Sequence, residues 1–231
     1  MLFFLAACSK ENAGSGPAPT NPPADTSIPG NTYRSYLALG DSYTIGTSVS
    51  IAERFPVQTV TKLITGGTPM YPAEIKATNG WTTGDLLNSI INNPPSRTSY
   101  DLVSLLIGVN NQYQGRSQQE YRTQFTTILN KAVNFAGGNK NRVFVLSIPD
   151  YSVTPFAAQS DTVRISNEID AFNAINREIS LQVGVQYLDI TNISREGRTD
   201  PAMQAGDGLH PSGKQYDRWS SLLAPMMKAS L

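Results

Sequence analysis

Ser42 is the residue around which the chemistry of this sequence is best sought, because it follows Asp41 and a short apolar run that ends at Gly40. A serine hydroxyl is a weak nucleophile, so it needs a general base, an acid that orients the base and donors for an oxyanion. His210 is the only histidine in the sequence and the one candidate base of the usual kind. Asp207 lies three residues before it, close enough for one short turn to present the carboxylate to the imidazole ring.

Taken singly, these signals are weak. A Gly-Asp-Ser segment is more often a turn or a helix cap than a nucleophile, and an aspartate near a histidine is sometimes only a structural hydrogen bond. Their meaning depends on whether the fold brings them together.

Short β-rich runs alternate with longer segments whose apolar residues recur three or four apart, which is typical of βαβ units. Strands are predicted at about 35–39, 73–78, 101–107, 142–148 and 185–190. Helices are predicted over about 56–65, 84–92, 117–137, 162–182 and 213–228. The nearly continuous apolar run at 101–107 indicates a parallel strand buried on both faces. The sequence therefore predicts an α/β protein, a three-layer α/β/α sandwich with right-handed crossovers.

Helical spacing also predicts which side chains are buried. The apolar residues of the two C-terminal helices that we expect in the core are Ile165, Ile169, Phe172, Ile175, Ile179, Tyr216, Trp219, Leu222 and Leu223. Ser117 and Glu120 have the spacing of a capping box at the start of the third helix.

Candidate polar residues follow successive strands. Ser42 follows the first strand, 79–84 follows the second, 108–111 follows the third, and 207–210 precedes the last helix. Ligands of such sheets bind at the carboxyl ends of the strands. We therefore expect these segments to face one crevice.

Four segments resemble the SGNH, or GDSL-type, hydrolase family. They are Gly40-Asp41-Ser42, Gly84, Gly108-Val109-Asn110 and Asp207-Gly208-Leu209-His210, in the family's order. The resemblance covers nearly the whole domain. It implies a flavodoxin-like fold with a five-stranded parallel sheet of order 2-1-3-4-5, and ester hydrolysis without a cofactor or metal.

The resemblance also implies a role for each residue. Ser42 is expected to be the nucleophile, His210 the general base and Asp207 the acid that holds and polarises the imidazole. The oxyanion hole is expected to use the backbone N–H of Ser42, the backbone N–H of Gly84 and the side-chain amide of Asn110.

Two details of the motifs are open. Gly84 is preferred as the backbone donor because it lies five residues beyond Asn79, but Gly80 is the alternative, and either glycine could simply serve the turn. The third motif usually continues with an aspartate, whereas here Asn111 follows Asn110. We expect this neighbour to support the loop and to take no part in bond making.

Large side chains beside the motifs have two interpretations. Trp81, Tyr43 and Tyr113 either line an acyl or alcohol pocket or pack in the core. Arg116 either meets an anionic head group or uronate, or is a solvated loop charge.

The N-terminal segment predicts attachment to a membrane. Cys8 is the only cysteine and follows an apolar run that ends in Leu-Ala-Ala, which resembles a bacterial lipoprotein signal, although the run is short and no basic segment precedes it. An ordinary signal-peptide fragment or a buried strand is the alternative. We therefore divide the chain into a signal remnant at 1–7, a lipidated cysteine with a flexible tether at 8–32, and a hydrolase domain at 33–231.

Composition narrows the partners. Eighteen basic residues balance eighteen acidic ones over 231 residues, so the basic field that holds nucleic acid is not expected. The sequence predicts a monomeric serine esterase, lipid-anchored in the bacterial cell envelope and facing the periplasm or the surface. Its substrates are expected to be acyl or acetyl esters, with a slight preference for the lysophospholipid type. A polysaccharide deacetylase and a non-catalytic binding lipoprotein are the alternatives.

Overall fold

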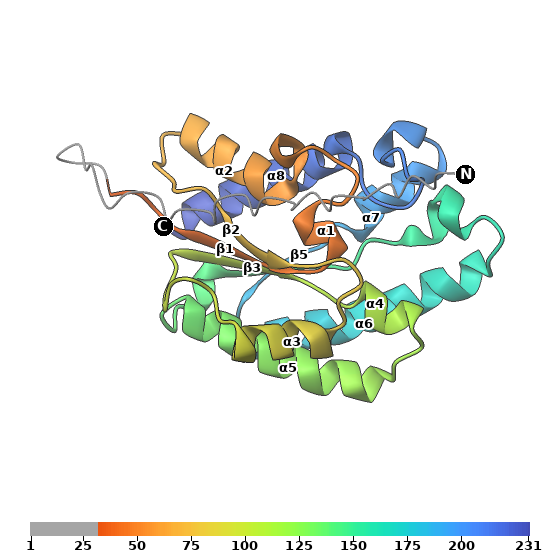
Figure 1. Cartoon of the computed structure of the whole chain (residues 1–231), viewed down its shortest axis with the longest axis horizontal. Helices are drawn as coiled ribbons and strands as arrows, with labels where there is room; N and C mark the ends of the chain where they lie inside the picture. The colour runs from red at the N-terminus through yellow and green to blue at the C-terminus, as the bar shows by residue number, and fades with distance from the viewer. Residues whose placement is uncertain (1–31) are drawn as a thin grey trace, which may run out of the picture. The chain divides into compact units, whose positions relative to one another are not determined.

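The computed structural model of the chain describes residues 32–231, and Tyr33–Leu231 form one structural unit (Figure 1). The predicted signal remnant, the lipidation of Cys8 and all but the last residue of the predicted tether lie outside the described residues. Within residues 32–231, no helix has both the length and the hydropathy that a membrane span requires.

Five parallel strands form the central sheet. They are β1 (Tyr36–Gly40), β2 (Glu74–Ala77), β3 (Leu102–Leu106), β4 (Val143–Leu146) and β5 (Gln186–Leu188), in the order β2-β1-β3-β4-β5. The predicted strand order is confirmed. Gly40 pairs with Ala77 on one side and with Leu106 on the other, so these three strands end at the same level of the sheet.

Helices cover both faces of the sheet, as Figure 1 shows, with α2 and α8 on one face and α3, α5 and α6 on the other. The helices are α1 (Ser42–Ile45), α2 (Phe55–Thr65), α3 (Thr83–Asn92), α4 (Val109–Tyr113), α5 (Gln118–Phe135), α6 (Thr162–Val183), α7 (Thr191–Arg195) and α8 (Gly213–Ala229). Short 3-10 turns lie at η1 (Ile51–Glu53), η2 (Lys140–Arg142), η3 (Tyr151–Val153), η4 (Pro155–Ala157), η5 (Glu196–Arg198) and η6 (Pro201–Met203). The predicted three-layer architecture is therefore confirmed.

Each predicted strand and helix is present, with ends within two residues of those predicted. The predicted core is confirmed except for Leu222, which is 44% exposed. The buried face of α8 is set by Trp219, Leu223 and Met227, and Leu222 lies well to one side of that stripe at 100° per residue. The predicted capping box is only half formed, because Ser117 accepts from the Glu120 N–H while the Glu120 carboxylate accepts from Gln124.

The short helices α1, α4 and α7 are absent from the sequence-based prediction. Each begins within three residues of the carboxyl end of a strand, at the edge where the site lies. They are four or five residues long, which is too short for an apolar period to be read from sequence.

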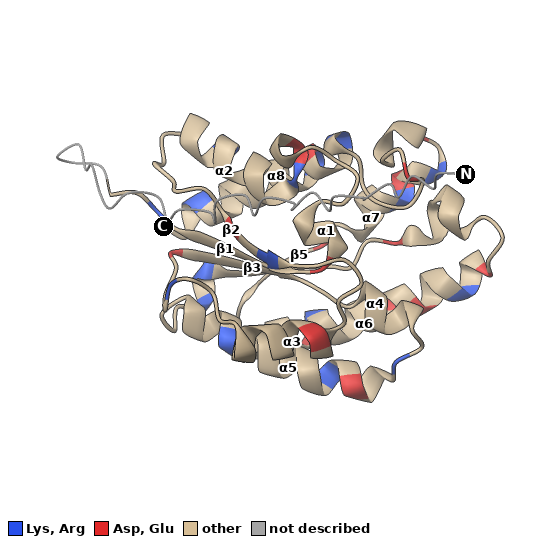
Figure 2. Cartoon of the chain, in the orientation of Figure 1, with Lys and Arg blue, Asp and Glu red and all other residues tan. Residues whose placement is uncertain are grey.

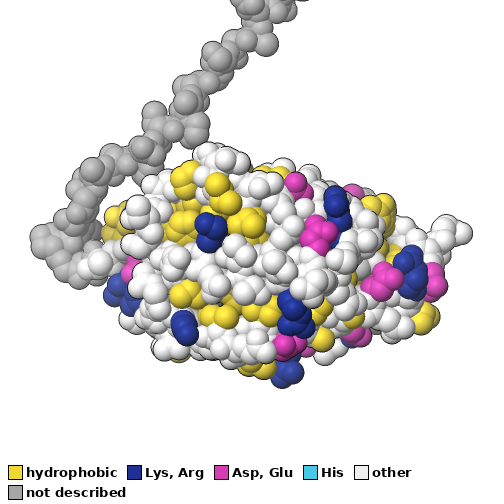
Figure 3. All heavy atoms as spheres, turned by 90° about the horizontal axis from the view of Figure 1, so that it is seen from below, with side chains coloured by type: hydrophobic (Ala, Val, Ile, Leu, Met, Phe, Trp, Pro, Cys, Tyr) yellow, Lys and Arg dark blue, Asp and Glu magenta, His cyan; other side chains and the backbone are white. Residues whose placement is uncertain are grey.

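Charged residues of both signs are interspersed along the domain (Figure 2). Figure 3 shows the face that carries α3 and α5, where hydrophobic side chains lie in small groups separated by polar and charged ones. Ile91 of α3 is more than half exposed. Neither view singles out a face of one charge or one continuous apolar patch.

Candidate active site

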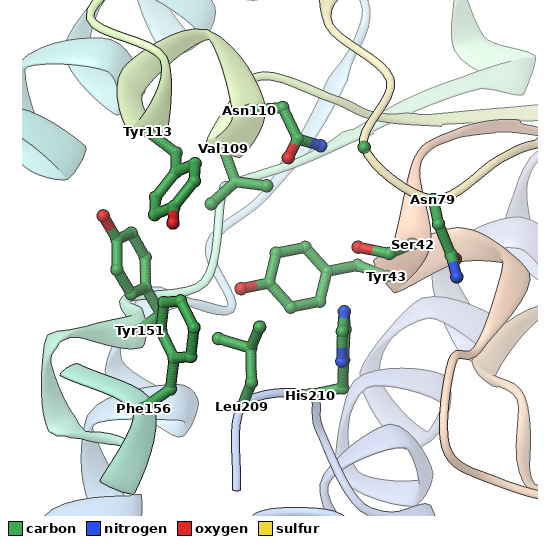
Figure 4. Close-up of a pocket in the computed structure, with 11 residues that line it drawn as sticks. Ser42, Tyr43, Asn79, Val109, Asn110, Tyr113, Tyr151, Phe156, Leu209 and His210 are labelled. Carbon is green, nitrogen blue, oxygen red and sulfur yellow. The ribbon is translucent and has the colours of Figure 1, made fainter. Parts of the chain in front are cut away.

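A cavity of about 220 Å³ opens at the carboxyl edge of the sheet (Figure 4). Its lining comes from segments far apart in the sequence: Ser42, Tyr43, Asn79, Gly80, Val109, Asn110, Tyr113, Tyr151, Phe156, Leu209 and His210. The fold therefore gathers residues that follow β1, β2, β3 and β4 with the loop before α8.

Ser42 is the first residue of α1, immediately after β1. Asp41 caps this helix, because its Oδ1 accepts a hydrogen bond of 3.0 Å from the Tyr43 N–H. Gly40 permits the abrupt turn: a Cβ at this position would lie 2.4 Å from the Leu106 carbonyl oxygen, closer than any real side chain approaches. The strand end thus delivers the serine hydroxyl at a fixed place on the cavity wall.

The Asp207–His210 pair faces Ser42 from the loop before α8. His210 Nδ1 lies 2.6 Å from Asp207 Oδ2, and Asp207 Oδ1 accepts hydrogen bonds of 3.0 Å from the backbone N–H groups of Leu209 and His210. Gly208 makes this turn possible with φ at +70°. In Figure 4 the other ring nitrogen is directed toward Ser42.

The electrostatics of Asp207 favour the carboxylate. Partial burial acts to raise its pKa, but hydrogen bonds from Ser48, from the two backbone N–H groups and from His210 outweigh burial and hold the pKa well below its usual range. Asp207 is therefore an anion at neutral pH. In that state it fixes the orientation of the imidazole and stabilises its protonated form.

Ser48 is a site residue that no motif or periodicity in the sequence indicated. Its Oγ donates a 2.6 Å hydrogen bond to Asp207 Oδ2, the same oxygen that contacts His210. Among residues 32–231 it is the only non-glycine residue with a positive φ, +65°. Backbone strain of this kind concentrates at functional sites.

Asp41 is in the opposite environment from Asp207. It is 1% exposed, and its Oδ2 has no hydrogen-bond partner among the described residues. Burial raises the pKa of Asp41 to about 7, although the backbone N–H groups of Tyr43 and Gly108 act to lower it. An acid beside the candidate nucleophile therefore changes its charge near neutral pH.

The three predicted oxyanion donors do not all reach the cavity. Ser42 and Asn110 line it, and Asn110 Nδ2 donates to the Trp81 carbonyl at 3.0 Å, which orients the amide and leaves its second N–H available. Gly84 lies in the first turn of α3 beside the Gln124 side chain and does not line the cavity. Gly80, the alternative, does line it. Of the two glycines weighed from the sequence, Gly80 is therefore the one at the cavity, because the chain has already entered the helix at position 84.

Asn111 connects the segments that carry Gly80 and Asn110. Its buried Oδ1 accepts from the Thr83 N–H at 2.9 Å, and its Nδ2 donates to Thr83 Oγ1 at 2.7 Å. The residue that replaces the expected aspartate thus ties the start of α4 to the start of α3.

Aromatic rings close the end of the cavity away from Ser42 (Figure 4). The ring centroids of Tyr113, Tyr151 and Phe156 lie 6.1–6.4 Å apart, and Tyr113 and Phe156 are 60% and 49% exposed. We call these three residues the aromatic wall. Tyr151 and Phe156 were not foreseen, because they lie on 3-10 turns without a readable period. Of the three aromatic residues that the sequence singled out, Tyr43 and Tyr113 line the cavity and Trp81 does not.

The fold and this edge of the sheet define the class of the protein: an α/β protein whose chemistry-bearing side chains lie in the short helices and loops at the carboxyl ends of parallel strands. Residues 38–218 match the family described as GDSL-like Lipase/Acylhydrolase. The chain belongs to this family and is accordingly a hydrolase that acts on esters. No curated protein matches the sequence closely enough to count as a relative.

Solved structures share the fold. The structure titled TesA is 18% identical with a TM-score of 0.65, and the match covers 86% of this chain and 100% of that one. A lipase/acylhydrolase from Enterococcus faecalis is 17% identical with a TM-score of 0.67, covering 85% and 96% of the two chains. A psychrotrophic esterase, EstA from Pseudoalteromonas sp., is 17% identical with a TM-score of 0.57, covering 85% and 96%.

Asp41 makes stability depend on pH. Because burial raises its folded-state pKa, its contribution to stability is fully present below the unfolded pKa near 3.8 and is lost as the pH rises through about 7. The wild type loses this contribution between pH 4 and pH 8, whereas the Asp41→Asn variant has no group that titrates at this position. We therefore expect the free energy of unfolding of the variant, minus that of the wild type, to rise by up to about 4 kcal/mol over this range. Urea denaturation measures this. The difference at pH 4 isolates the packing effect of the substitution, and a difference that stays constant up to pH 8 would contradict the assignment.

Ser48 is expected to support Asp207. Ser48→Ala removes one donor to the carboxylate, so the pKa of Asp207 rises and kcat/KM falls by about three- to tenfold, with the acid-side loss of activity beginning at a higher pH. Ser48→Gly is the matched control, since it removes the same hydroxyl but accepts the positive φ without strain. Both variants are expected to show the same pH profile of ester hydrolysis. Wild-type profiles for both would rule out action through Asp207.

Proposed function

We propose that the protein is a serine esterase in which Ser42, His210 and Asp207 form the catalytic triad. The observation that carries the proposal is the 2.6 Å contact between His210 Nδ1 and Asp207 Oδ2, with the opposite ring nitrogen directed toward Ser42. This arrangement holds the imidazole in the tautomer that can accept a proton from the serine.

In the proposed reaction, Ser42 Oγ attacks the ester carbonyl while its proton passes to His210 Nε2. The resulting tetrahedral oxyanion is stabilised by the backbone N–H groups of Ser42 and Gly80 and by Asn110 Nδ2. Collapse breaks the bond to the leaving oxygen, which takes the proton from His210 and departs as an alcohol. Water then attacks the acyl-serine with His210 as the base, which releases the acid and restores the serine.

The lining of the cavity supports an acyl group as the part bound next to Ser42. Tyr43, Val109 and Leu209 present apolar surface, and the aromatic wall limits the depth. A cavity of about 220 Å³ bounded in this way suits a short or medium acyl chain. A long-chain lysophospholipid fits only if its chain passes the aromatic wall.

Removal of acetyl groups from a polysaccharide is the second candidate. The exposed faces of Tyr113 and Phe156 favour it, because aromatic rings at the rim of a site can pack against sugar rings. Lipidation at Cys8 and a location in the bacterial cell envelope stay part of the proposal and rest on the sequence alone.

The triad is tested by substitution of its members. Ser42→Ala and His210→Ala are expected to abolish turnover of a nitrophenyl ester while circular dichroism shows an intact fold. Asn110→Ala is expected to lower kcat by about a hundredfold with little change in KM, because the oxyanion exists only in the transition state. Turnover by His210→Ala would contradict the triad, and a loss for Asn110→Ala through KM alone would contradict the oxyanion role. A folded wild type without turnover would favour the non-catalytic binding lipoprotein.

Chain length is the test of substrate class. Across nitrophenyl esters from acetate to palmitate, kcat/KM is expected to peak at short or medium chains and to fall once the chain reaches the aromatic wall. Phe156→Ala removes part of that wall, so it is expected to move the optimum to longer chains. A sharp fall beyond butyrate in both proteins would favour the deacetylase, and a maximum at palmitate in the wild type would contradict the depth limit.

A further inference from the structure

A second cavity, of about 470 Å³, lies on the other side of the aromatic wall from Ser42. Tyr113, Tyr151 and Phe156 line both cavities, so the two spaces share one partition. The rings of Tyr113 and Phe156 in this partition are about half exposed or more. A bound molecule that extends across these two rings can therefore contact both cavities. The second cavity is therefore placed to receive a part of the same substrate.

The charges around this second cavity are unequal. Glu168, the only acid that the described residues contribute to its lining, accepts a 3.0 Å hydrogen bond from Arg164 Nη1 and a 2.7 Å hydrogen bond from Gln112 Nε2. The Glu168 charge is thus already matched by Arg164 within α6.

Arg116 is the other basic residue in the lining of this cavity. Its guanidinium makes no hydrogen bond or ion pair with any residue of the described range 32–231. Its backbone is nevertheless fixed, since the Arg116 N–H donates to the Asn111 carbonyl at 2.8 Å. Asn111 also links α4 to α3 and directly follows Asn110 in the chain. The backbone positions of Arg116 and Asn110 therefore both depend on Asn111.

We propose that the second cavity is a subsite for an anionic group of the ester substrate, with Arg116 as its main charge partner. A guanidinium binds carboxylate and phosphate through paired N–H donors, and Gln118 and Ser160 add neutral polar groups to the lining. This inference rests on the proposed function, because it assigns the ester to the Ser42 cavity. The anion is either the carboxylate of an acidic sugar or the phosphate of a glycerophosphate head group.

Binding to the Ser42→Ala protein tests the subsite without turnover. Titrations followed by NMR at low ionic strength use glucuronate and glycerol 3-phosphate as the anions, with glucose and glycerol as their neutral counterparts. We expect saturable binding of at least one anion, at least about fivefold tighter than its neutral counterpart. The anion that binds more tightly identifies the source of the charge. Because this experiment measures binding alone, its result can be interpreted even if the proposed reaction does not occur.

Charge variants in the same background make the test specific. Arg116→Gln is expected to weaken anion binding at least about fivefold, and Glu168→Gln to tighten it severalfold by removing the Glu168 charge from the cavity. Arg177→Gln is the control: this arginine is on the same helix as Arg164, 13 residues and about 20 Å further along, and is expected to change nothing. The proposal is overturned if anions bind no better than neutral counterparts, if Arg177→Gln and Arg116→Gln have equal effects, or if Glu168→Gln weakens binding.

Discussion

The site depends on one constraint: β1, β2 and β3 all end at the same level of the sheet. Gly40 pairs with both Ala77 and Leu106, and the loops that follow these residues all leave the sheet at one edge. A side chain at position 40 would collide with the Leu106 carbonyl, so the glycine allows β1 to turn into α1 at once. Residues separated by more than 150 positions in the chain thereby reach one cavity of about 220 Å³.

Two aspartates of the site are tuned in opposite directions by their surroundings. Asp207 accepts hydrogen bonds from Ser48, from two backbone N–H groups and from His210, and its pKa is held low. Asp41 is buried with one carboxylate oxygen unpartnered, and its pKa is raised to about 7. The first arrangement keeps a permanent negative charge beside the imidazole, and the second places a group of variable charge beside Ser42, the proposed nucleophile.

The sequence was sufficient where periodicity and position carry the information. The alternation of strands and helices predicted the layers, and the order of the motifs predicted that Ser42, Asn110 and His210 would meet. It failed where contacts are made by short irregular segments. Ser48 donates a hydrogen bond to Asp207, which lies 159 positions further along the chain, and Ser48 itself is a loop residue with a strained backbone. No periodic pattern encodes such a contact.

The choice between the two glycines shows the same limit. The spacing from Asn79 favoured Gly84, but the position of a backbone N–H is decided by where α3 begins, and the helix has already started at Thr83. Asn111 illustrates the reverse case, in which a departure from the expected aspartate retains a supporting function through its amide. The identity of a residue was thus more predictable than the geometry of its backbone.

The central claim is that Ser42 is the nucleophile of a pre-formed oxyanion site. A phosphonate forms a stable tetrahedral adduct with an activated serine, which makes it a suitable probe of this site. The most direct measurement is a crystal structure of this protein after reaction with a phosphonate ester. The account predicts a phosphorus–oxygen bond to Ser42 Oγ, with the phosphonyl oxygen within hydrogen-bond distance of the Gly80 N–H and Asn110 Nδ2. An unmodified Ser42 on the folded protein, or an adduct whose oxygen points away from both donors, would contradict it.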